Sequence, residues 1–319
     1  MKRLGYGMIL IVLCILISLI SFPVSGQSVK KMPFIFIPKL VHPWYQDVIT
    51  GMNNAKAFLE KTGQVKLTLE WMAPPKADVT QHVNMIESAI RKKPNGLAVA
   101  VLDPSADVPV IKDAIAAGIP TICFDTDAPE SGRITFVGRT DYLADGREMA
   151  KVLAKAIKGK GEIAILLGSL GAPNHKLRVQ GFKEEIAKYP DIKIVAEEAD
   201  NDDLERAVSL TETILRKHPN LAGIYGCNAT APIGAARAVE DAGKSGKVIV
   251  VGMDDLPEMI EFMKKGTVYA MSVQRVKEIG FWSVIYLWAM NEGHTVPPFH
   301  DTGSLVVFKE QLGTYSKWK

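Results

Sequence analysis

Strand-like and helix-like segments alternate along nearly the whole chain, and this alternation limits the available folds more than any other feature. The strand-like segments are short and carry few polar residues, as in 96–102 and 161–167, which is typical of strands buried on both faces of a parallel sheet. The segments between them, such as 79–92, place apolar residues at helical spacing. A repeated strand–helix–strand order predicts an α/β fold with parallel sheets covered by helices on both faces.

The alternation begins again after residue 140, which predicts two lobes rather than one. After removal of a leader, about 290 residues remain, too many for one ordinary hydrophobic core. We expect two Rossmann-like lobes joined by a multi-strand hinge. The predicted N-terminal lobe is residues 30–139 plus 275–300, and the predicted C-terminal lobe is residues 140–274 plus 301–319.

Residues 1–26 have the three-part pattern of a secretory signal peptide. Two basic residues near the start precede an unbroken apolar run at 8–20, and small residues follow at 24–26. The apolar run is shorter than the roughly 20 residues that a membrane-spanning helix needs. The pattern therefore predicts a mature chain that begins near Gln27 and works in the periplasm or another extracytoplasmic compartment.

The charge balance disfavours two classes of partner. The whole chain has a formal net charge of +3, and the leader supplies +2 of it through Lys2 and Arg3. The remaining +1 gives no basic patch of the kind that nucleic acids or anionic lipids attract. We expect neither partner.

The cysteines favour buried thiols rather than a cross-link or a metal site. Cys123 and Cys227 each end an apolar segment outside the leader, and we expect them to be buried as small hydrophobic side chains. A disulfide between them is the alternative that an oxidising compartment permits. The sequence contains no clustered Cys/His spacing, so we expect no metal and no cofactor.

Polar and aromatic residues follow the ends of several predicted strands. Ligands of open α/β sheets bind at these carboxyl ends, and a cleft between two lobes is the default site. Carboxylates accept hydroxyl groups, amides donate and accept, cations donate, and an aromatic face covers the apolar face of a sugar ring. The set therefore suits a polyhydroxylated ligand.

Six segments, in order, resemble the type I periplasmic sugar-binding proteins of the ribose/galactose class, the receptor subunits of ATP-driven importers. They are His42-Pro43-Trp44-Tyr45, Ile119-Pro120 through Asp125, Arg178 through Gly181-Phe182, Asn228, Gly252-Met253-Asp254, and Gln274. The resemblance implies a periplasmic-binding-protein-like fold of type I and a monosaccharide or related small polyol in the interlobe cleft. It further implies delivery to the permease and ATPase subunits of an ABC importer, a monomeric state and no catalysis.

Strand ends and resemblance together give eleven candidate ligand-binding residues. They are Lys39, His42, Trp44, Tyr45, Asp125, Lys176, Arg178, Asn201, Asn228, Asp254 and Gln274. Each has a structural alternative: aromatic residues can be core, aspartates can cap turns, and Arg178 can pair with Glu184 or Glu185. His42 and Met253 depart from the residues usual in the class, so the sugar stays open.

Other functions compete with sugar import. Lys39 in its segment 36–40 resembles the start of receptors for rhamnose and for the furanose signal autoinducer-2, although the Asp-Gln pair of the latter is not evident near Asn174-His175. A chemosensory receptor is a further alternative. An exported glycosidase with Asp125 and Asp254 as its carboxylate pair is disfavoured, because no nucleophile motif, metal set or phosphate loop accompanies them.

Overall fold

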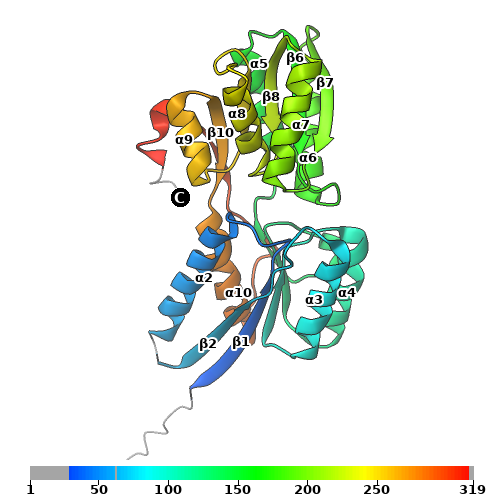
Figure 1. Ribbon diagram of the computed structural model, residues 1–319. Coiled ribbons are helices and arrows are strands. Elements are labelled where there is room, and N and C mark those ends of the chain that lie inside the picture. The colour runs from blue at the N-terminus through cyan, green and yellow to red at the C-terminus, as the bar shows by residue number, and fades with distance from the viewer. Residues whose placement is uncertain (1–28, 62, 316–319) are drawn as a thin grey trace, which may run out of the picture.

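The computed structural model describes residues 29–61 and 63–315 and shows two α/β lobes joined by several crossings of the chain (Figure 1). Each lobe contains a six-stranded sheet, with strand order β11-β5-β4-β3-β1-β2 in the N-terminal lobe and β12-β10-β9-β8-β6-β7 in the C-terminal lobe. Most neighbouring strands are parallel, and β12 pairs antiparallel to β10. The predicted fold class is confirmed, whereas the predicted leader lies outside the described residues.

The helices and strands have the following bounds. The N-terminal lobe contains β1 (Lys30–Ile37), α2 (Tyr45–Glu60), β2 (Val65–Trp71), α3 (Val79–Arg91), β3 (Gly96–Val99), α4 (Pro104–Ala116), β4 (Thr121–Phe124), β5 (Phe136–Gly138), α10 (Val276–Asn291) and β11 (Phe299–Asp301). The C-terminal lobe contains α5 (Tyr142–Ala156), β6 (Gly161–Leu167), α6 (Pro173–Ile186), β7 (Ile192–Ala199), α7 (Leu204–Lys217), β8 (Leu221–Gly226), α8 (Ala231–Asp241), β9 (Ile249–Met253), α9 (Pro257–Lys265), β10 (Val268–Gln274) and β12 (Ser304–Phe308).

Each sheet is buried on both faces, which explains why its strands read as apolar runs. In β1, Phe34 and Phe36 pack into one core cluster with α2 and α10, whereas Ile35 and Ile37 pack into the cluster on the opposite face. All four side chains are at most 2% exposed. Burying such a side chain contributes about 1.5–3 kcal/mol relative to leaving it in water.

Two helix pairs approach to backbone contact through glycines, one pair in each lobe. A Cβ atom on Gly51 of α2 would lie 1.9 Å from the carbonyl oxygen of Lys277 in α10, and one on Gly146 of α5 would lie 1.9 Å from that of Arg178 in α6. Any larger side chain at these positions would push the helices apart. The second crossing places the first two turns of α5 against the middle of α6, since a Cβ on Gly181 would lie 2.1 Å from the carbonyl oxygen of Leu143.

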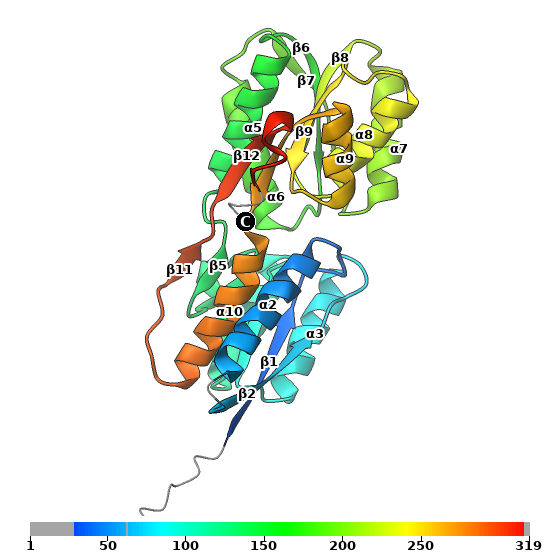
Figure 2. The ribbon, with the colours of Figure 1, turned by 90° about the vertical axis from the view of Figure 1, so that its left-hand side faces the viewer.

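The chain passes between the sheets three times within the described residues. The crossings run from β5 to α5, from β10 to α10 and from β11 to β12 (Figure 2). Arg139 ties the first crossing to the third, since its Nε donates to Asp145 at 2.9 Å and its Nη1 to Asp301 at 2.9 Å. The short strands β11 and β12 were not predicted. The residues of β11 are half-exposed or exposed and lack an apolar pattern, whereas β12 contains an apolar run at 305–308 that was not assigned to a strand.

Cys123 and Cys227 are free and buried, one in each lobe, so the prediction of two separate buried cysteines is confirmed. Burial raises the pKa of Cys227 to about 12 and that of Cys123 further. Among the described helices, none has the length and apolar character needed to cross a membrane.

Candidate functional site

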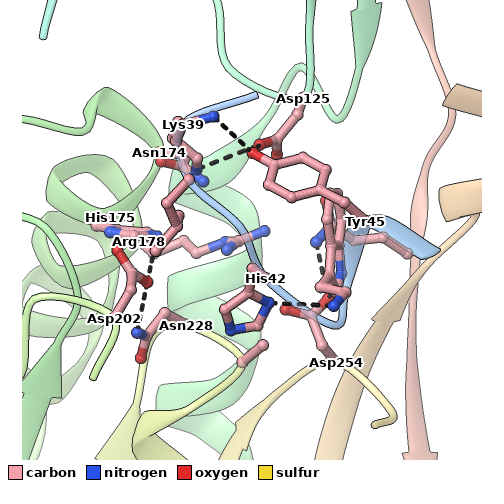
Figure 3. A pocket seen from close by; sticks show the side chains of 14 residues that line it. Lys39, His42, Tyr45, Asp125, Asn174, His175, Arg178, Asp202, Asn228 and Asp254 are labelled. Atoms are coloured by element: carbon pink, nitrogen blue, oxygen red, sulfur yellow. Dashed lines mark hydrogen bonds and ion pairs between the residues drawn. The ribbon is translucent and has the colours of Figure 1, made fainter. Parts of the chain in front are cut away.

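A polar pocket lies between the lobes and comprises about 370 Å³ of empty space, including space open to solvent. Figure 3 shows its side chains converging from both lobes. The N-terminal lobe supplies Lys39, Leu40, His42, Trp44, Tyr45 and Asp125. The C-terminal lobe supplies Asn174, His175, Arg178, Asp202, Asn228, Ala229, Asp254 and Gln274.

The three aspartates of the pocket share one unusual backbone conformation. Asp125 and Asp254 directly follow β4 and β9, and Asp202 follows β7 after two intervening residues. Their φ angles are 59°, 65° and 59°, in the left-handed region. Such a conformation costs a non-glycine residue about 1–3 kcal/mol and clusters at ligand sites. The chain therefore bends sharply at each strand end and turns a carboxylate toward the cavity.

On the N-terminal lobe, Asp125 belongs to a closed network. Its Oδ2 accepts the Tyr45 hydroxyl at 2.7 Å and lies 3.2 Å from the Lys39 ammonium nitrogen. The Tyr45 hydroxyl in turn accepts the Lys39 backbone N–H at 3.4 Å. Burial and the Asp125 charge hold the pKa of Tyr45 well above its ordinary value. Lys39, which is 6% exposed, thus neutralises a carboxylate in a region shielded from water.

Asp254 links the two lobes. Its Oδ1 accepts the indole N–H of Trp44, from the other lobe, and the amide of Gln274, each at 2.9 Å. Burial raises the pKa of Asp254, and the positive charge of Arg178 opposes that rise. Both bonds go to Oδ1, so Oδ2 receives neither.

Asn228 joins two buried carboxyl groups, Asp202, which lines the pocket, and Asp200, which does not. Its Nδ2 donates to Asp200 Oδ1 at 3.1 Å and to Asp202 Oδ1 at 2.8 Å. Its Oδ1 accepts the backbone N–H of Ala231 at 3.2 Å, at the first residue of α8. Asn228 therefore lines the pocket and also satisfies one of the free backbone N–H groups at the start of that helix.

The two carboxyl groups are pushed to different protonation states. Burial, reinforced by the charge of Asp202, raises the pKa of Asp200 to about 8, so this group carries its proton at neutral pH. Burial also acts to raise the pKa of Asp202, but nearby His175 and Lys39 and the hydrogen bonds from Asn228 and Ser169 together lower it below its ordinary value. Asp202 is the ionised partner and faces the cavity.

Helix α6 carries three buried side chains, each with at least one polar atom that has no hydrogen-bond partner within the described residues. These atoms are Asn174 Oδ1, His175 Nδ1, and Nε and Nη2 of Arg178, and each side chain belongs to a residue at most 3% exposed. Burial lowers the pKa of His175 to about 4, so its ring is neutral at pH 7. An unmet buried polar group costs about 1–3 kcal/mol, so a ligand that supplies these partners gains that energy.

Three groups of the protein contact the Arg178 guanidinium. Its Nη1 donates to the carbonyl of Cys227 at 3.2 Å, its Nε lies 3.8 Å from Asp145 Oδ2, and its Cζ lies 5.3 Å from the centre of the Tyr142 ring. The alternative pairing with Glu184 or Glu185 is not present.

Two predicted residues do not line the pocket. Lys176 is exposed on α6. Asn174 and His175 lie four and three residues before Arg178 and share its face of the helix, whereas Lys176, two residues before Arg178, lies across the helix. Asn201 is exposed on the loop after β7, and its neighbour Asp202 reaches the cavity instead.

Sequence reasoning missed Asn174, His175 and Asp202. For the first two the available signal was their spacing of four and three residues from Arg178, which puts them on the same helix face. For Asp202 the signal was the acid-rich segment 200–203. Within residues 29–61 and 63–315, no cluster of three or more His, Cys, Asp or Glu side chains is arranged to hold a metal.

Comparisons with known proteins agree with this geometry. The family model described as periplasmic binding protein domain matches residues 34–295. The D-allose-binding periplasmic protein of Escherichia coli K12 is 28% identical over 271 residues, covering 82% of this chain and 86% of that protein.

Two solved structures extend the likeness. The solute-binding protein of an ABC transporter from Burkholderia graminis, in complex with D-arabinose, is 35% identical, with a TM-score of 0.83 and coverage of 90% of this chain and 98% of that chain. A solute-binding protein from Agrobacterium vitis with bound D-fucose is 29% identical, with a TM-score of 0.84 and coverage of 89% and 98%.

The chain belongs to the periplasmic binding protein family. This is a family of non-catalytic solute-binding proteins, so the prediction of a binding protein rather than an enzyme is confirmed.

Proposed function

We propose that this protein captures a monosaccharide or a related small polyol between its lobes and delivers it to the permease of an ABC importer. One observation carries the proposal: Asp125 from one lobe and Asp254 from the other are buried, fixed by neighbouring side chains and open onto the same pocket as the free donors of Arg178. Carboxylates accept hydroxyl groups through strong charge-assisted bonds.

A neutral sugar suits the pocket better than an acidic one. Its cations, Lys39 and Arg178, already lie near carboxylates at 3.2 and 3.8 Å, and burial lowers the pKa of both His42 and His175. The named ligands of the related proteins, D-allose, D-arabinose and D-fucose, are neutral too. Because Lys39 lies in the pocket, rhamnose-type deoxysugars and furanoses stay among the candidates.

Ligand binding would favour a closed arrangement of the lobes, because a sugar that touches both gains contacts that an open state lacks. We take residues 30–139 with 275–300 and residues 140–274 with 301–319 as the moving units. The permease would recognise the closed form outside the cytoplasm, and its ATPase subunits would drive transport.

The test is isothermal titration calorimetry with neutral pentoses, hexoses, deoxysugars, furanoses and polyols. We expect one group of stereochemically related sugars to bind at about micromolar affinity or better and to raise the melting temperature by mass action. Asp125→Ala and Asp254→Ala should each abolish binding, whereas Asp255→Asn, beside the site but not lining it, should retain it. Binding that survives both alanine variants would refute the proposed site, and absence of any sugar ligand would refute the function.

A further inference from the structure

We infer that Tyr142 is a positioning residue that couples the two halves of the binding site, an inference that rests on the function proposed above. Tyr142 does not line the pocket, yet it contacts one lining residue from each lobe. Its hydroxyl donates to the backbone carbonyl of Asp125, and its ring lies 5.3 Å from the guanidinium carbon of Arg178. Tyr142 is the first residue of α5, just after the first crossing between the lobes.

The hydroxyl contact holds the bend that aims the Asp125 carboxylate. Asp125 adopts a φ of 59°, which is a strained angle for a residue with a Cβ. Its backbone N–H donates to Val137 at 3.0 Å, and its carbonyl accepts the Tyr142 hydroxyl. With both backbone groups fixed, the side chain is directed at the pocket.

The ring contact orients the free donors of Arg178. A guanidinium over an aromatic face is attracted by the ring quadrupole, more strongly where water is absent, and Tyr142 and Arg178 are 5% and 1% exposed. The close crossing of α5 and α6 sets this geometry, since a Cβ on Gly146 would lie 1.9 Å from the carbonyl oxygen of Arg178. Nε of Arg178 faces Asp145 at 3.8 Å, whereas Nη2 has no hydrogen-bond partner among the described residues and its N–H groups are available to a sugar.

Tyr142 also lines a second cavity between the lobes. This cavity comprises about 1010 Å³ of empty space, including space open to solvent, and its wall contains Phe136, Leu177 and Phe299. A smaller side chain at position 142 would connect that space with the Arg178 guanidinium. Water would then screen the charge that the binding site uses.

The experiment compares Tyr142→Phe, Tyr142→Leu and Tyr225→Phe by calorimetry with the tightest sugar of the panel. Tyr225 is the matched control: it is a fully buried tyrosine of the same lobe, stacked on Phe182 at 4.3 Å, and its hydroxyl has no partner among the described residues. We expect Tyr142→Phe to weaken binding about ten-fold and Tyr142→Leu about a hundred-fold, from the loss of one and then both contacts. Tyr225→Phe should stay within about two-fold of the wild type, as expected where no bond is lost.

A double-mutant cycle separates positioning from a general loss of packing. If the ring acts through Arg178, Tyr142→Leu should cost much less in an Arg178→Met background than in the wild type. Equal losses in both backgrounds, or Tyr142→Phe and Tyr225→Phe with equal affinities, would overturn the inference while leaving the sugar-binding function intact. A wild-type protein that binds no sugar of the panel would overturn both.

Discussion

The two walls of the pocket differ in how their buried charged side chains are paired. On the N-terminal lobe, Asp125, Lys39 and Tyr45 bond to one another. On the C-terminal lobe, Arg178 and His175 of α6 line the pocket and carry buried polar atoms with no hydrogen-bond partner among the described residues. The charged groups of the N-terminal wall are bonded to one another, whereas the unbonded groups of α6 can be bonded by a ligand.

This difference assigns different roles to the two walls. A wall whose polar groups already bond to one another changes little when the ligand arrives and supplies shape and a fixed acceptor. A wall with unmet buried groups gains the full energy of each new bond. We therefore expect most of the binding energy to come from the C-terminal lobe.

The largest expected effect is at Arg178. Arg178→Met removes the unpartnered Nη2 group, whose two N–H donors are each worth about 1.5–3 kcal/mol once bonded, so the dissociation constant of the sugar should rise about a thousand-fold in calorimetry. Arg147→Met is the matched control, because Arg147 is an exposed arginine on α5 that pairs with Glu184. Equal affinities of the two variants would show that the C-terminal wall is not the main source of binding energy.

At the opposite wall, Lys39→Met should act first on folding. It leaves the Asp125 carboxylate buried without its cation, and breaking a buried pair in this way costs about 3–5 kcal/mol. Urea unfolding of the sugar-free protein measures this loss. Lys176→Met, at an exposed position outside the pocket, is the comparison; if the two lysine variants unfold alike, the N-terminal wall is not held by its own ion pair.

From the carboxyl pair Asp200 and Asp202 of the C-terminal lobe we predict a pH dependence of the free energy of unfolding. The native state holds the Asp200 proton up to about pH 8, whereas the ordinary value is 3.8. Between these values the native state binds more protons than the unfolded state, so the free energy of unfolding falls as the pH rises. This group contributes a slope of up to about 1.4 kcal/mol per pH unit. Asp200→Asn should flatten the curve between pH 5 and 8, and parallel curves for variant and wild type would contradict the assignment.

The smallest effect concerns the two thiols, one in each lobe. Burial raises the pKa of both, so a disulfide reagent should react only when a lobe opens. Sugar should slow modification of Cys227 more than that of Cys123, because the carbonyl of Cys227 accepts a bond from Arg178. The single variants Cys123→Ala and Cys227→Ala allow each rate to be measured separately, and equal slowing would indicate that both walls are stabilised alike.

The fold was predictable because alternating apolar strands and amphipathic helices fix an α/β architecture directly. Asp125 and Asp254 were predictable for the same reason: each follows a strand whose end was visible in the sequence. Strand β11 was not, since pairing with β5 rather than local pattern defines its three residues. Strand β12 offered an apolar run as a signal, but its antiparallel pairing with β10 joins distant segments.

The C-terminal wall was harder to predict because it depends on helical phase and loop conformation. On α6, spacings of four and three residues from Arg178 place Asn174 and His175 at the pocket and leave Lys176 exposed. A left-handed turn at Asp202 moves the pocket residue one position from Asn201. The bond between Trp44 and Asp254 joins residues 210 apart in sequence, and no local pattern reveals it.

The most direct test of the account is a crystal structure of the protein with the sugar that calorimetry selects. We predict one sugar molecule between the lobes, with hydroxyl groups on Asp125 and Asp254 and with Nη2 of Arg178 bonded to a sugar oxygen. A sugar held by one lobe alone, or seated in the cavity beside Phe299 with Arg178 still unpartnered, would contradict it.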